Sequence, residues 1–267
     1  GLRTHVSEGG SGTPLLLVHG VGGPRVWQRV FEPLSNQFRV MAPDLPGFGE
    51  SDPPSGSYAS AEYAEFIFAL TEMLDARRIV LCGTSWGGEV AVRFADRHPD
   101  LVSHLILICS TGMHHRSYAE GPLAAKILPA LLKWPLFRSR YMIDYFSRRS
   151  YYRIENRPPG LCDQIIAGLR MPGRSAALSN ALLNALRGDR EFPGKLSRLR
   201  MPSLIIWGRN DAIVPVRDAP EFRRHIPGST LELLSQCGHS VPLEKPRELV
   251  DAILKFTGKE PQCLKQR

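Results

Sequence analysis

The chain has 267 residues, of which 43% are hydrophobic and 22% are charged, proportions typical of a soluble globular protein. This composition excludes a disordered or fibrous chain, and no apolar run approaches the roughly 20 residues that a membrane-spanning helix needs. The net charge of +8 is concentrated in residues 113–200, which carry 16 Lys and Arg against 6 Asp and Glu. No nucleic-acid-binding motif accompanies this charge, so we expect no nucleic-acid partner.

The predicted elements alternate between strands and helices. Short apolar runs recur along the chain, as is typical of strands buried on both faces of a parallel sheet. Two helices between them are clear: one over residues 61–76, with Ser60 as its N-cap, and one over residues 89–98, which ends before Pro99. This alternation predicts an α/β protein with a wound parallel sheet. The predicted strands span residues 15–18, 38–42, 78–82, 105–109, 203–207 and 230–234.

The regular alternation breaks once, between residues 109 and 203. A connection of this length cannot be a plain loop in a compact domain. We therefore predict a helical insertion over residues 113–200 that covers one face of the sheet, within a core formed by residues 1–112 and 201–267. The predicted helices of the insertion span residues 123–132, 140–149, 160–169 and 175–186.

The chain has five cysteines, an odd number without C-x-x-C spacing, so we expect neither a disulfide framework nor a zinc site. We interpret them as free thiols in a reducing compartment. The first twelve residues are polar and glycine-rich, without the apolar core of a signal peptide. Together these features predict a cytoplasmic location.

The segment Gly83-Thr84-Ser85-Trp86-Gly87 places a serine in a turn between a predicted strand and a predicted helix. A chain that reverses sharply at this point needs small residues two positions before and two positions after the serine. The pattern is typical of a nucleophile elbow, in which a strained turn exposes the serine hydroxyl.

A serine hydroxyl is a weak nucleophile at neutral pH, so it needs a base and a third group that orients the base. Asp211 follows the predicted strand 203–207, and His239 follows the strand 230–234. All three groups therefore lie at the carboxyl ends of strands, where reactive groups of an open α/β sheet gather. The order Ser, Asp, His distinguishes this arrangement from other serine-hydrolase folds. Asp189 and Asp218 stay open as alternatives to Asp211.

Five motifs in the correct order make the chain resemble the α/β-hydrolase superfamily over nearly its full length. Besides the elbow and the two loops that carry Asp211 and His239, they are the His-Gly loop at residues 19–23 and the D-x-x-G-x-G-x-S turn at residues 44–51. The resemblance implies an eight-stranded, mostly parallel sheet flanked by helices, with a helical cap inserted after the sixth strand. It also implies an oxyanion hole formed by the backbone N–H groups of Val21 and Trp86, with no metal or organic cofactor.

The resemblance assigns the roles of nucleophile to Ser85, of general base to His239 and of orienting acid to Asp211. We expect a serine esterase or lipase that acts on a small-molecule acyl ester with an apolar acyl group. A carbon–carbon bond hydrolase of ring-cleavage products, an aminopeptidase or amidase, and a non-enzymatic ligand receptor remain as alternatives. A serine at the elbow disfavours dehalogenases and most epoxide hydrolases, which carry aspartate there.

Candidate substrate-pocket residues are Trp27, Trp134 and Phe137. The last two belong to a strongly apolar run at residues 127–137, which arginines follow. We hypothesise an apolar acyl pocket under a basic-rimmed lid that also contacts anionic lipid surfaces. The alternative is that these apolar residues pack the cap on the sheet.

Overall fold

The protein is described by a computed structural model that covers residues 1–54, 56, 58–113, 139–171, 173–187 and 189–260. Seven strands form one sheet in the order β1-β3-β2-β4-β5-β6-β7. All neighbouring strands pair in parallel except β1, which is antiparallel to β3. The strands are β1 (Val6–Gly9), β2 (Pro14–Val18), β3 (Arg39–Pro43), β4 (Ile79–Thr84), β5 (Val102–Ile108), β6 (Ser203–Gly208) and β7 (Thr230–Leu234).

All six predicted strands are confirmed, but the expectation of eight strands is wrong, since the described residues form seven. The unpredicted β1 is an edge strand, and its side chains are exposed or only half-buried, so it carries no apolar run. The residues before it do not form a further strand, and Arg3 bonds to Asp52 instead. The chain therefore has five strands before the insertion and not the six expected, so the insertion follows β5.

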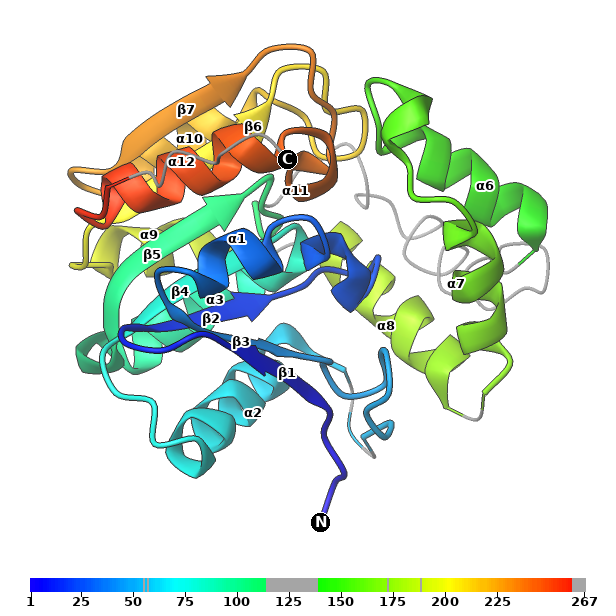
Figure 1. The fold of residues 1–267 in the computed structure, drawn as a ribbon, viewed down its shortest axis with the longest axis horizontal. Helices are drawn as coiled ribbons and strands as arrows, with labels where there is room; N and C mark the ends of the chain where they lie inside the picture. The colour runs from blue at the N-terminus through cyan, green and yellow to red at the C-terminus, as the bar shows by residue number, and fades with distance from the viewer. Residues whose placement is uncertain (55, 57, 114–138, 172, 188, 261–267) are drawn as a thin grey trace.

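Helices cover both faces of the sheet (Figure 1). One face carries α1 (Phe31–Ser35) and α12 (Pro246–Phe256), and the other carries α2 (Ser60–Met73), α3 (Trp86–Arg97), α9 (Phe192–Arg198) and α10 (Asp218–His225). The predicted N-cap of α2 is wrong, since the helix begins at Ser60 and its hydroxyl donates to Glu89. The short elements are η1 (Pro24–Trp27), η2 (Pro99–Leu101), η4 (Ile154–Asn156) and α11 (Val241–Glu244).

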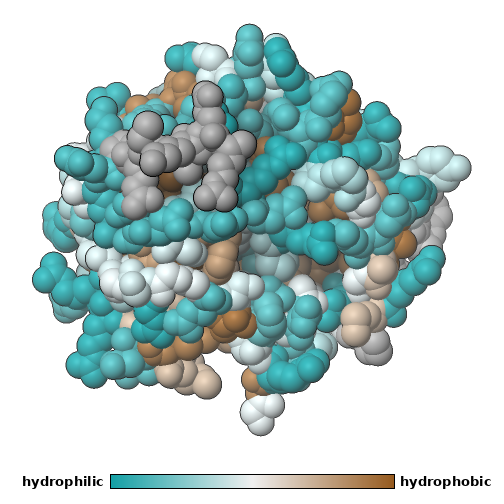
Figure 2. Space-filling model, in the orientation of Figure 1, coloured by the Kyte–Doolittle hydropathy of each residue, from teal (hydrophilic) through white to brown (hydrophobic). Residues whose placement is uncertain are grey.

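The core lies between the sheet and these helices. Every residue of β4 and β6 is buried, because both strands are covered on both faces. Trp86, Trp207 and Phe94 are among the largest fully buried side chains. Hydrophobic residues on the face shown in Figure 2 are scattered among hydrophilic ones. Within the described residues, no helix combines the length and the apolar character that crossing a bilayer requires.

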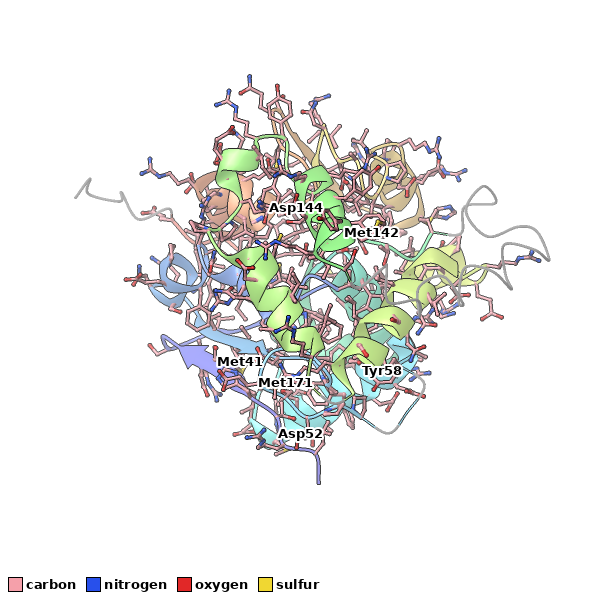
Figure 3. The ribbon with its side chains drawn as sticks, turned by 90° about the vertical axis from the view of Figure 1, so that its right-hand side faces the viewer. Met41, Asp52, Tyr58, Met142, Asp144 and Met171 are labelled. Carbon is pink, nitrogen blue, oxygen red and sulfur yellow. The ribbon has the colours of Figure 1, made fainter. Side chains whose placement is uncertain are left out.

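Within residues 113–200, α9 lies on the sheet with the core helices. The rest of the inserted segment contributes α6 (Arg140–Arg149), α7 (Leu161–Leu169) and α8 (Arg174–Arg187), which coincide with three of the predicted helices. The predicted helix over residues 123–132 lies outside the described residues. Figure 1 shows these helices, hereafter the cap, on the side toward which β2, β5 and β7 point, and Figure 3 views the molecule from that side. Asp144 on α6 pairs with both Arg148 and Arg157, at 2.5 and 2.6 Å, so part of the basic charge of the cap is neutralised locally.

Candidate active site

Ser85 occupies the turn between β4 and α3. Its φ and ψ angles of 54° and −125° lie outside the helix and strand regions, so the turn holds backbone strain. A Cβ at Gly83 would lie 2.4 Å from Gly87 O, and one at Gly87 would lie 2.3 Å from Val18 O. Both contacts are with backbone atoms, so the turn requires glycine at these two positions, as the sequence pattern predicted.

Replacing Gly87 with alanine is expected to destabilise the fold, because the backbone carbonyl of Val18 cannot move out of the way of the new Cβ. Overpacking a buried position costs about 1–3 kcal/mol in the free energy of unfolding, which urea titration measures. Gly194→Ala in α9 is the matched control. Its nearest atom would be 3.7 Å away, so this variant should equal or exceed the wild type in stability. Equal unfolding midpoints for Gly87→Ala and the wild type would contradict the expectation.

Three side chains from three strand ends form one hydrogen-bonded chain. His239 Nε2 lies 3.0 Å from Ser85 Oγ, and His239 Nδ1 lies 2.7 Å from Asp211 Oδ2. Asp211 Oδ1 accepts hydrogen bonds from the backbone N–H groups of Ile213 and Val214, at 2.8 and 2.9 Å. The Asp211 side chain is fully buried and that of His239 is 12% exposed. The carboxylate is therefore held rigidly, and the imidazole faces the serine at the edge of the site.

Asp189, one of the alternatives to Asp211, pairs with Arg93 at 2.9 Å and with Lys195 at 3.1 Å. Asp218, the other alternative, is buried at the start of α10. The carboxylate hydrogen-bonded to His239 is that of Asp211. The geometry thus selects the loop after β6 as the source of the acid.

The predicted oxyanion donors are the backbone N–H groups of Val21 and Trp86, and Trp86 directly follows Ser85 in the chain. Trp86 is the first residue of α3, so its N–H has no acceptor within the helix. Val21 is in a turn closed by a hydrogen bond of 3.0 Å from Gly23 N to Gly20 O. This turn packs directly on the nucleophile, because a Cβ at Gly20 would lie 2.8 Å from Ser85 Cβ. Both N–H groups therefore belong to segments that border Ser85.

His19 supports the turn that carries Val21. Its Nε2 accepts a hydrogen bond of 3.0 Å from Leu45 N, so its Nδ1 carries the proton and donates to Gly20 O at 2.7 Å. Burial lowers the pKa of His19 to about 4. The ring is therefore neutral at neutral pH, and it links the turn to the segment after β3.

A cavity of about 730 Å³ opens beside Val21, between the sheet and the cap. Trp27 and Phe48 line it from the core, residues of α7 line it from the cap, and Arg25 and Arg174 add positive charge. Trp27 is only 2% exposed, so it is mainly a core residue with one edge on the cavity. The other two predicted pocket residues, Trp134 and Phe137, lie outside the described residues. The volume lies within the range of about 300–1,000 Å³ that is usual for small-molecule sites.

A buried carboxylate that the sequence patterns did not reveal lies behind the elbow. Glu89 in α3 is 2% exposed and accepts hydrogen bonds from Ser60 Oγ at 2.6 Å, Arg93 Nη2 at 3.2 Å and Thr111 Oγ1 at 3.3 Å. Thr111 N also donates to Ser85 O at 3.1 Å. This cluster braces the elbow from within the core. The sequence feature that could have revealed this cluster is Glu89 itself, a charged residue one helical turn after Ser85 on a helix that is otherwise largely apolar.

Cysteines 82, 109, 162 and 237 are buried free thiols, and Cys263 lies outside the described residues. Burial raises the pKa of Cys82, Cys109 and Cys237, so these thiols stay protonated and are poor metal ligands. Within the described part of the chain, the grouping with metal-ligand spacing is Cys109, Asp211 and His239, whose ligand atoms lie within 4.8 Å of one another. Asp211 and His239 are already hydrogen-bonded to each other, so the arrangement favours a proton-transfer chain over a metal centre.

A wound, mostly parallel sheet with serine, histidine and aspartate at its strand ends defines a hydrolase of the α/β type. The chain belongs to the alpha/beta hydrolase family, whose model matches residues 15–252. It is 31% identical to the pimeloyl-[acyl-carrier protein] methyl ester esterase of Nitrosomonas europaea, over 92% of this chain and 96% of that protein. It is 27% identical to a 2-hydroxy-6-oxo-2,4-heptadienoate hydrolase of Pseudomonas putida, over 97% and 94%. Among solved structures, an esterase of Thermogutta terrifontis superimposes with a TM-score of 0.81 at 27% identity, over 96% and 93%.

Proposed function

We propose that this protein is a serine hydrolase that cleaves carboxylic esters through an acyl-enzyme. The observation that carries the proposal is the continuous hydrogen-bonded chain from Ser85 through His239 to Asp211, with distances of 3.0 and 2.7 Å. Nucleophile, base and orienting acid are within hydrogen-bond reach of one another, as nucleophilic catalysis requires.

Ser85 Oγ attacks the acyl carbon while His239 Nε2 takes its proton, and Asp211 stabilises the imidazolium that forms. The oxygen of the tetrahedral intermediate accepts hydrogen bonds from the N–H groups of Val21 and Trp86. When the intermediate collapses, the alcohol leaves with the proton from His239. A water molecule then attacks the acyl-enzyme while His239 accepts its proton. His239 returns this proton to Ser85 Oγ as the bond from Oγ to the acyl carbon breaks, and the carboxylic acid is released.

The cavity beside Val21 supports an ester with a sizeable apolar group. It extends from the turn that carries Val21 to α7, and its lining includes Val21, Phe48 and Leu178. Ser85 and His239 are not among its lining residues, so the cavity adjoins the catalytic side chains through the Val21 turn. Similarity to two esterases, one of which is named for a methyl ester of a carrier-bound acyl chain, supports the same substrate class.

Carbon–carbon bond hydrolysis is a second candidate. Arg25 and Arg174 on the cavity wall can pair with an anionic substrate, while Asp44 and Glu50, which also line the cavity, offset part of their charge. The similar Pseudomonas putida protein is named for the hydrolysis of a dienoate, which is such an anion.

The test measures turnover of p-nitrophenyl esters from acetate to decanoate and of 2-hydroxy-6-oxo-2,4-heptadienoate, together with labelling by a fluorophosphonate. Labelling with ester turnover would support the esterase. Labelling with turnover of the dienoate alone would assign the carbon–carbon hydrolase. Labelling with neither would point to an amide or peptide substrate, and no labelling would favour a ligand receptor.

Replacing Gly22 with phenylalanine is expected to shorten the preferred acyl chain. Gly22 lines the cavity, its φ is not positive, and a Cβ there would meet no atom within 4 Å, so a side chain fits and fills the pocket. We expect kcat/KM for the longest productive ester to fall at least about tenfold relative to the acetate. Gly22→Ala is the control and should keep the wild-type profile. An equal loss for every chain length would argue that the cavity does not hold the substrate.

A further inference from the structure

The loop that carries His239 is bound to the cap on both sides of the histidine. On one side, Ser240 N donates to Ser150 O at 3.0 Å. On the other, Gly238 N donates to Glu244 Oε1 at 2.8 Å, and Tyr152 N donates to Glu244 Oε2 at 2.7 Å. One carboxylate therefore bridges the histidine loop and residues 150–153, which directly follow α6 and are called cap segment 150–153 below.

The contact between the loop and the cap segment is close. A Cβ at Gly238 would lie 2.8 Å from Tyr152 N and 2.9 Å from Ser150 O. Glu244 is only 8% exposed, and Arg153 N makes a third, longer contact of 3.5 Å with its Oε2. The backbone N–H groups of Gly238 and Tyr152 would lose their acceptor if the carboxylate were removed.

Glu244 belongs to α11, which is anchored independently of its side chain. Glu244 N donates to Ser240 O at 2.9 Å, and Arg29 donates to the carbonyl of the neighbouring Leu243. Removing the carboxylate should therefore leave the helix in place while it frees the Gly238 side of the histidine loop from the cap, and the bond from Ser240 N to Ser150 O remains.

We propose that Glu244 is a positioning residue for His239. Its carboxylate joins the histidine loop to cap segment 150–153, so that the position of the cap determines the distance from His239 to Ser85. The inference rests on the proposed function in one respect, that Ser85 is the nucleophile. Movement of the cap at this edge then changes both the position of His239 relative to Ser85 and the access to the cavity.

The test compares Glu244→Ala and Glu244→Gln with the wild type in the full chain. The control is Glu248→Gln in α12, whose carboxylate pairs at the surface with Lys245. Two quantities are measured: the second-order rate of fluorophosphonate labelling, which needs no identified substrate, and kcat and KM for p-nitrophenyl acetate. We expect both the labelling rate and kcat of Glu244→Ala to fall about 10- to 100-fold, with KM within about twofold, because a misplaced catalytic group lowers the rate of reaction. Glu244→Gln keeps one acceptor oxygen and should lie between Glu244→Ala and the wild type.

A folded Glu244→Ala protein that labels at the wild-type rate would overturn the proposal, as would a change confined to KM. If the alanine variant fails to fold, the isosteric glutamine variant decides by the same criteria. Should the wild type label without ester turnover, the proposed ester substrate fails, but the labelling rates still test Glu244. An unlabelled wild type would overturn both proposals, since both need an activated Ser85.

Discussion

Replacing Ser85 with alanine is expected to lower kcat for the best ester by about 10⁴- to 10⁶-fold and to abolish fluorophosphonate labelling. The Ser85 hydroxyl lies 3.0 Å from His239 Nε2 and is the side-chain nucleophile that the described site offers to this base. The oxyanion donors are backbone groups and survive the substitution, so the residual rate reports their contribution. Single-turnover and steady-state kinetics measure the decrease in the rate of ester hydrolysis.

Ser110→Ala is the matched control for this variant. Ser110 is also buried next to the elbow, but its hydroxyl donates to Thr111 O at 3.0 Å. Its loss should change kcat by no more than a few-fold, with a similar small effect on the unfolding midpoint. Retained labelling in a folded Ser85→Ala protein would contradict the assignment of the nucleophile.

Replacing Asp211 with asparagine is expected to lower kcat by about 10⁴-fold without unfolding the protein. Oδ1 of Asp211 accepts from Ile213 N and Val214 N, at 2.8 and 2.9 Å, so the amide oxygen takes this place and the NH₂ group turns toward His239. The NH₂ group then donates to Nδ1, which moves the ring proton to Nε2. A ring protonated at Nε2 donates to Ser85 and can no longer accept its proton.

Steady-state kinetics of Asp211→Asn, with circular dichroism as the check on folding, tests this expectation. Asp189→Asn is the control, because Asp189 is the acid that pairs with Arg93 and Lys195. It should keep kcat within a few-fold of the wild type. A kcat for Asp211→Asn within tenfold of the wild type would mean that another group orients His239.

Much of the fold could be predicted because its elements carry local signals. The buried parallel strands read as apolar runs, and the elbow requires small residues at defined positions around Ser85. The edge strand β1 carries no such signal, since only one side of it pairs with the sheet and its side chains are partly exposed. The expectations of eight strands and of an insertion after the sixth came from the family resemblance and not from a local signal. Both are too high by one, because the described residues before β1 form no strand.

Contacts between distant segments were beyond prediction. Ser60 looks like a helix cap in the sequence, but its hydroxyl is used by Glu89, 29 residues away. Glu244 looks like an ordinary surface glutamate until α11 folds it between Gly238 and Tyr152. Neither pairing follows from spacing, because each depends on how separate elements pack.

The sequence by itself determined the class of fold, the elbow at Ser85 and the strand-end positions of Asp211 and His239, because these depend on local backbone demands and on the shared direction of parallel strands. The tertiary structure alone decided which acid reaches His239, where the cavity opens beside Val21 and which carboxylate joins the histidine loop to the cap. The contact of the acid with His239 and the bridge to the cap depend on hydrogen bonds of 2.7 to 3.0 Å between residues at least 28 positions apart in the chain. The cavity depends on how the cap packs, and only the packed elements set such features.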